Sequence, residues 1–255
     1  MADWLFILAG GAAAGVFGSL LGLGGGILIV PLLTLGFGLE LREAVGVSLV
    51  SVIMTSSAAA GVYLERRIAD LRLGMRLELF TAIGALVGGS IAFLIEERWL
   101  SILFAGLLLY VAVSMLRART TVTPAGGSEE RPDEVRNVPF GVVGATGAGV
   151  MSALLGIGGG LVKVPLMHLV MGIPLRVATA TSNLMVGITA AAGAVIYLAR
   201  GEIDPYVAGP TAIGVFVGAS LGSRVAHRID LRILRWLFVV VLLYTAIQMF
   251  LRAGS

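Results

Sequence analysis

The sequence predicts an all-α polytopic membrane protein made of two inverted repeats. Three observations predict this class: the composition, the lengths of the apolar stretches and an internal duplication. Of the 255 residues, 58% are hydrophobic and 13% are charged, whereas about a quarter of the residues in a soluble domain are charged. The mean hydropathy of +0.99 and the 36 glycines are typical of closely packed apolar helices. This composition excludes a soluble enzyme, a nucleic-acid-binding protein and a disordered chain.

Eight apolar stretches follow one another along the chain. Two of them, residues 4–37 and 140–173, are too long for one helical crossing of about 20 residues, and a glycine cluster interrupts each. We expect each long stretch to form a Gly-tipped hairpin, either re-entrant or made of short helices, followed by three transmembrane helices. The six stretches with the length of one crossing are residues 45–63, 79–95, 99–116, 177–198, 206–222 and 236–251.

The two halves of the chain are similar in sequence. Gly22-Leu-Gly-Gly-Gly26 followed by a proline matches Gly156-Ile-Gly-Gly-Gly160 followed by a proline, and the same offset of 134 residues aligns Ser48 with Ser182. Such duplication is typical of transporter folds. We predict a first membrane repeat at 1–116, a cytoplasmic linker at 117–138 and a second membrane repeat at 139–255. With a shift of four residues, Thr81, Gly84, Gly88 and Ser90 match Thr211, Gly214, Gly218 and Ser220.

The arginines predict how the repeats are oriented. Residues 64–77 carry four arginines and their counterpart at 199–205 carries one, whereas the next pair of loops, 96–98 and 223–235, shows the reverse bias. Because cytoplasmic loops are enriched in Lys and Arg, we expect the two copies to be inverted in the inner cell membrane. The linker then lies in the cytoplasm and both termini lie outside. The arginines expected outside are Arg42, Arg98, Arg200 and Arg252.

The glycine clusters are the first candidate site. A hairpin tip inside the bilayer must have its backbone groups covered by protein or by a water-lined cavity. Glycine allows positive φ, and the helix that follows points free N–H groups and the positive end of its dipole at the tip, which favours an anion. Two such tips would meet near the midplane, where inverted-repeat transporters bind substrates. The candidate residues are Gly24, Gly25, Gly26, Gly158, Gly159 and Gly160.

The alternative for these glycines is that they only let helices pack closely. Neither cluster fits a nucleotide-binding motif, because a Walker A loop ends in Gly-Lys-Ser/Thr and a dinucleotide fingerprint has a final glycine after a soluble strand. The duplication and the expected hairpins favour the anion site.

The paired motifs resemble those of the TauE/SafE sulfite exporter family. The resemblance extends to the small-residue helices after each hairpin, with Gly46, Val47 and Ser48 in the first half and residues 179–183 in the second. It implies transport of small sulfur-containing anions such as sulfite, sulfonates or sulfoacetate. Distant thiosulfate-uptake relatives have similar hairpins but use cysteines, and this chain has none.

Polar side chains near the clusters extend the candidate site. Lys163 is the only lysine and lies in an apolar stretch, where an ionisable group is costly and by default functional. It would bind an anion, or else it reaches the interface or pairs with a carbonyl. His168 would relay protons or be a satisfied interior group. Hydroxyls and one amide are further candidate ligands, with hydrogen bonding between helices as the alternative. They are Ser48, Ser182, Thr55, Thr189 and Asn183.

The acidic residues predict how the anion is held and moved. Every Asp and Glu lies at a terminus, in a loop or at a helix end, so we expect no buried carboxylate that relays protons. The chain would then hold its anion with backbone and hydroxyl donors. The inside-negative membrane potential favours export by about 2.3 kcal/mol per charge per 100 mV.

Three other functions stay open: an anion channel or facilitator built on the same tips, a structural membrane subunit, and an intramembrane serine protease. The protease would use Ser220, in the pattern Gly-Ala-Ser-Leu-Gly, with His168 or His227. That motif needs a strand-to-helix turn, whereas here it ends an apolar helix, where small residues favour packing. We expect a transporter that works by alternating access and is not an enzyme, without a cofactor or metal site. Its partners are a small anionic substrate and the lipid bilayer, without nucleic acid, and a homo-oligomer stays open.

Overall fold

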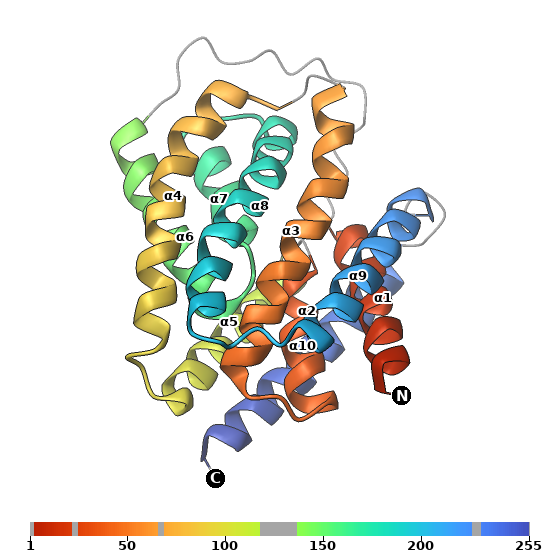
Figure 1. Ribbon diagram of the computed structural model, residues 1–255. Coiled ribbons are helices and arrows are strands. Elements are labelled where there is room, and N and C mark those ends of the chain that lie inside the picture. The colour runs from red at the N-terminus through yellow and green to blue at the C-terminus, as the bar shows by residue number, and fades with distance from the viewer. Residues whose placement is uncertain (1–2, 22–24, 66–68, 118–136, 226–230, 255) are drawn as a thin grey trace.

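The computed structural model describes residues 3–21, 25–65, 69–117, 137–225 and 231–254, and every regular element in these ranges is helical (Figure 1). The first half contains α1 (Asp3–Leu21), α2 (Gly26–Pro31), the π-helical turn η1 (Leu32–Gly36), α3 (Leu41–Glu65), α4 (Leu71–Ala92) and α5 (Glu97–Arg117). The second half contains α6 (Val138–Leu155), α7 (Gly160–Pro165), the π-helical turn η2 (Leu166–Val170), α8 (Leu175–Ala199), α9 (Pro205–Val225) and α10 (Leu231–Gly254). Both halves have the same order of elements. Most of the expected linker, residues 118–136, lies outside the described part.

The lengths of the helices confirm the predicted fold class. In the described part, α3, α4, α5, α6 and α8 are long and apolar enough to cross a membrane. Shorter apolar helices lie at residues 4–19, 26–36, 160–170 and 236–252. The chain is therefore an all-α polytopic membrane protein. Five of the six stretches expected to cross once lie within α3, α5, α8, α9 and α10, and the sixth, at 79–95, extends three residues past the end of α4.

Both long apolar stretches turn at their glycine clusters. Between α6 and α7, Gly156, Gly158 and Gly159 have φ values of 69°, 79° and 76°, which strain any residue with a Cβ. Gly25, with φ of 75°, begins α2 in the same way, while Gly24 lies outside the described residues. Each short helix ends in a proline, whose missing N–H interrupts the regular ladder, and a π-helical turn follows.

The halves pack against each other in repeat-related pairs. Helix α1 lies along α9, and its counterpart α6 lies along α4, the counterpart of α9. Helix α3 packs on its counterpart α8, and α5 on its counterpart α10. In Figure 1, α4 and α6 stand at the left, α1 and α9 at the right, and α3 and α8 between them. The contacts therefore have the pattern of a pseudo-two-fold arrangement.

The two hairpins open at opposite ends of α4. Met171, just after the second hairpin, packs in one apolar cluster with Leu73 near the start of α4. Thr34, at the open end of the first hairpin, lines a pocket with Glu97, which follows the end of α4. The two chain ends marked in Figure 1 both lie in its lower part. The open ends of the two hairpins thus lie near opposite ends of α4.

Glycines bring the backbones of the paired helices into direct contact. A Cβ on Gly218 of α9 would overlap the carbonyl oxygen of Ala12 in α1, and a Cβ on Gly88 of α4 would overlap that of Val150 in α6. These glycines therefore act in close helix packing, as their small-residue spacing predicts.

The start of α4 differs from the prediction. The apolar stretch begins at Leu79, but the helix begins at Leu71, and Asp70 caps it by accepting a hydrogen bond of 3.1 Å from the Leu73 amide. Glu78 therefore lies inside the helix and is only 4% exposed. The prediction that all carboxylates lie at termini, loops or helix ends was wrong, because the capped first turns of α4 are too polar to register as an apolar stretch.

Candidate functional site

The two glycine tips meet in the structure. A Cβ on Gly26, the first residue of α2, would lie 2.5 Å from the carbonyl oxygen of Gly156 at the second tip. The buried Ser48 of α3 links them: its Oγ donates a hydrogen bond of 2.7 Å to the Gly156 carbonyl and lies 3.3 Å from the Gly26 carbonyl. The hairpins from the two halves therefore share one centre.

Two buried hydroxyls border the second tip. A Cβ on Gly160 would lie 3.7 Å from Oγ of Ser182, and a Cβ on Gly159 would lie 3.3 Å from Cβ of Ser152. Ser182 is 2% and Ser152 is 1% exposed, and neither Oγ has a hydrogen-bond partner among the described residues. A buried hydroxyl that lacks a partner costs free energy, and both hydroxyls can still donate a hydrogen bond. The sequence singled out Ser182 but not Ser152, whose counterpart at the 134-residue offset is Gly18.

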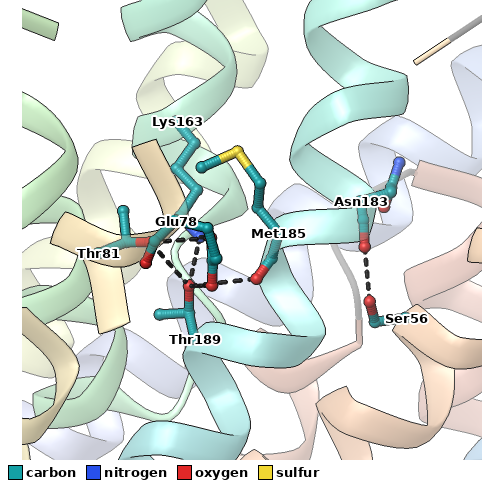
Figure 2. Close-up of polar contacts among 7 residues, drawn as sticks. All are labelled: Ser56, Glu78, Thr81, Lys163, Asn183, Met185 and Thr189. Atoms are coloured by element: carbon teal, nitrogen blue, oxygen red, sulfur yellow. Dashed lines mark hydrogen bonds and ion pairs between the residues drawn. The ribbon is translucent and has the colours of Figure 1, made fainter. Parts of the chain in front are cut away.

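A buried ion pair lies beside the same tip (Figure 2). Lys163 of α7 is 1% exposed, and its Nζ lies 3.1 Å from Oε2 of Glu78 in α4. Nζ also donates to Oγ1 of Thr189 in α8. Its aliphatic chain borders the tip, since Cε would lie 3.5 Å from a Cβ on Gly159. The cluster of Glu78, Thr81, Lys163 and Thr189 therefore joins both halves of the chain next to the glycine tip.

Hydrogen bonds reach both carboxyl oxygens of Glu78. Oε2 of Glu78 accepts from Lys163 and from Thr81 Oγ1 at 2.8 Å, and Oε1 accepts from Thr189 Oγ1 at 2.6 Å. Each hydroxyl also has a second acceptor in reach: the Glu78 backbone carbonyl lies 3.0 Å from Thr81 Oγ1, and the Met185 carbonyl lies 3.2 Å from Thr189 Oγ1. The two hydroxyl hydrogens can thus point either at the carboxylate or at the backbone.

This cluster corrects the expectation for charged groups. A buried carboxylate is present, and Lys163 neither reaches the interface nor pairs with a backbone carbonyl. A signal was available in the sequence, because a lone buried lysine needs a counter-charge. Asp70 as a helix cap would have extended α4 far enough to include Glu78.

Other predicted site residues lie in different surroundings. The amide of Asn183 donates to the Thr179 carbonyl of its own helix at 3.0 Å, and Thr55 Oγ1 donates to the Val52 carbonyl at 2.9 Å. Nδ1 of the exposed His168 lies 2.8 Å from the Ile173 carbonyl, at the open end of the hairpin. Ser220 is half-buried and donates to the Phe216 carbonyl inside α9, which is a helix and not the turn that the protease motif needs. His227 lies outside the described residues.

Arginines that the sequence places on one side of the membrane gather at one end of the helices. Arg42 and Arg200, from opposite halves, stack on the Phe93 ring at 5.6 Å and 5.1 Å. Arg98 and Arg252 line a nearby pocket of about 450 Å³. In the adjoining loop, burial raises the pKa of the Glu202 carboxyl above its usual value, and Arg42 opposes that shift. This end of the molecule therefore brings arginines and glutamates together next to an opening, since Glu40 and Glu97 line the same pocket.

Comparison with known proteins finds relatives that are named as membrane transporters. The chain is 25% identical over 265 residues to the "Probable membrane transporter protein YunE" of Bacillus subtilis, with 97% of each chain covered. It is 28% identical over 251 residues to a "Probable membrane transporter protein" of Xylella fastidiosa, with 97% of this chain and 95% of the relative covered. No solved structure matches the chain significantly. The family model "Sulfite exporter TauE/SafE" matches residues 7–249, and the chain therefore belongs to this family.

Proposed function

We propose that the chain transports small sulfur-containing anions, such as sulfite, sulfonates or sulfoacetate, across the inner cell membrane by alternating access. One observation carries the proposal: two glycine tips meet at a centre where two buried hydroxyls, on Ser152 and Ser182, lack a partner among the described residues. The family name and the transporter names of the relatives support the same substrate class and activity.

The geometry suits an anion held mostly by neutral donors. The helical segments at residues 26–36 and 160–170 both begin at the tips, so their first amides and the positive ends of their dipoles point at the centre. The hydroxyls of Ser152 and Ser182 can donate to anion oxygens, and Lys163 lies on the same tip. Neutral donors bind an oxyanion weakly enough for it to be released again, which transport requires.

The proposed topology has both termini outside and the linker in the cytoplasm. Opposite openings of the two hairpins along α4 support the inverted arrangement. The four arginines expected outside also gather at one end of the helices. Rocking of the paired helices around the central tips would then open the site to each side in turn. The inside-negative potential favours export of an uncompensated anion.

An anion panel tests the transport activity. We expect purified protein in liposomes to show saturating uptake of at least one labelled anion among sulfite, isethionate, sulfoacetate, thiosulfate and sulfate. Because a carrier exchanges its substrate, uptake is expected to rise when the same anion is loaded inside. Conductance far above carrier turnover would instead support a channel, and no flux above empty liposomes for any anion would contradict the proposal.

The second tip is expected to be sensitive to a single methyl group. Gly159→Ala strains the backbone by about 1–2 kcal/mol at its φ of 76° and places a methyl group beside the Ala148 carbonyl and Ser152. We expect counterflow to fall about tenfold or more, equivalent to about 1.4 kcal/mol. Gly201→Ala is the matched control, because Gly201 has a φ of 79° and nothing within 4 Å of an added Cβ. If the two variants showed equal flux, the second glycine tip would not be part of the anion site.

A further inference from the structure

The ion pair of Glu78 and Lys163 occupies only one of two repeat-related positions. Lys163 and Thr189 of the second half correspond to Ile29 and Thr55 of the first. At the four-residue shift that relates α4 to α9, Glu78 and Thr81 correspond to Ala208 and Thr211. Ile29, Ala208 and Thr211 are also buried. The fold therefore accepts an apolar pair at this position, and the charged pair is not needed to build the hairpin.

The hydroxyls around Glu78 suit both protonation states of its carboxyl group. With the carboxylate ionised, Thr81 and Thr189 donate to it. With the carboxyl protonated, it becomes a donor itself, and both hydroxyls can turn to the backbone carbonyls already within 3.0 Å and 3.2 Å. The cluster can thus take up one proton without leaving a hydroxyl hydrogen unpaired.

We propose that Glu78 binds the transported proton, and that Lys163 binds the anion when it does. This inference rests on the proposed anion transport. One proton from the aqueous phase neutralises the Glu78 carboxylate, which releases Lys163 as an uncompensated ammonium at the tip. The ammonium has three N–H donors, of which the described contacts use two. A monoanion then replaces the carboxylate as its counter-charge, and both ligands leave on the other side.

Few other charged groups face this cluster. Helix α6 has no titratable residue, α7 has Lys163 only, and α8 has Arg176 in its first turn and Tyr197 in its last. On α4 itself, Arg72 and Arg76 are exposed and Asp70 is the helix cap. On η2, the exposed His168 contacts the Ile173 carbonyl. Glu78 is thus the acidic group in direct contact with Lys163.

Coupling changes the driving force for transport. A monoanion that moves with one proton carries no net charge, so the membrane potential no longer drives it. Its direction follows the anion gradient and the pH gradient. Glu78→Gln keeps the neutral, hydrogen-bonding form of the side chain, and we expect it to convert the cotransporter into an uncoupled carrier that the potential does drive.

The test uses isethionate, whose sulfonate keeps one negative charge as the pH changes, in liposomes that contain the full-length protein. An external pH about one unit below the internal pH should make wild type accumulate isethionate up to about tenfold and should leave Glu78→Gln without accumulation. A tenfold inward potassium gradient with valinomycin should have the reverse effect: up to about tenfold accumulation by Glu78→Gln and none by wild type. Glu96→Gln, at an exposed glutamate, should behave as wild type.

If Glu78→Gln folds poorly, a measurement on wild type alone still tests the proposal. With the potential clamped, addition of isethionate should acidify the liposome interior, as read by a trapped pH dye. Three results would each overturn the coupling and leave the proposed transport intact. They are isethionate flux without acidification, a Glu78→Gln variant that still responds to the pH gradient, and a folded Glu78→Gln variant without counterflow. If wild type moves no anion of the panel, the proposed function fails and the coupling fails with it.

Discussion

Replacing Lys163 alone by isoleucine is expected to destabilise the protein strongly, whereas the double variant with Glu78→Ala is expected to fold nearly as well as wild type. The single change leaves the Glu78 carboxylate buried, with two hydroxyls but no counter-charge. Breaking a buried ion pair in this way costs about 3–5 kcal/mol, while replacing both partners by apolar residues is often neutral or stabilising. The double variant also copies the counterpart position, where Ile29 and Ala208 are buried together with Thr55 and Thr211.

This stability cycle is measured by thermal unfolding of the purified protein in detergent, followed by tryptophan fluorescence and size exclusion. Arg76→Ala, at an exposed position on the same helix, is the control and should change stability by less than about 0.5 kcal/mol. A single variant as stable as wild type would mean that Glu78 needs no counter-charge at this position, either because it takes up a proton or because its surroundings are not apolar. If the double variant were as unstable as the single one, the ion pair would be needed to build the hairpin, although the counterpart position in the other half is apolar.

The hairpins could be predicted because their causes are local. A stretch too long for one crossing, interrupted by glycines and followed by a proline, has few ways to remain in a membrane. The duplication makes the prediction stronger because the same pattern occurs twice. The symmetry of the two hairpins predicts that their tips meet. It does not predict the individual hydrogen bonds there, because Ser48 donates to the second tip while Oγ of Ser182 has no partner among the described residues.

The ion pair was missed for two physical reasons. Arg72, Arg76 and Glu78 lower the hydropathy at the start of α4, although Leu73 and Leu77 are buried and line the inner face at helical spacing. The pair also joins residues 85 positions apart, from opposite halves. Comparison of the halves holds a usable signal, since both positions are charged in one copy and apolar in the other. Two positions at which one half is charged and the other apolar therefore predict a site that both halves form together.

Added side-chain bulk is expected to disturb folding most where helix backbones touch. Gly218→Leu is expected to abolish a stable folded protein, because a Cβ there already overlaps the Ala12 carbonyl and the helix α1 cannot yield without leaving α9. Gly149→Leu should act in the same way through the Thr81 carbonyl of α4. Ordinary overpacking costs about 1–3 kcal/mol because side chains can shift, whereas here the atom met is backbone, so the cost is expected to exceed that range.

Glycines inside helices that face open space provide the controls. Gly106 on α5 and Gly147 on α6 have nothing within 4 Å of an added Cβ, so Gly106→Leu and Gly147→Leu should express, elute as one species and melt close to wild type. The four variants share the same chemical change and differ only in what lies opposite, so their comparison separates packing from helix propensity, for which leucine is better than glycine. If Gly218→Leu and Gly149→Leu melt like their controls, the paired helices α1–α9 and α4–α6 do not pack backbone to backbone. Since these two pairs hold the hairpins of one half against the other, their loosening should also lower anion counterflow before the protein unfolds.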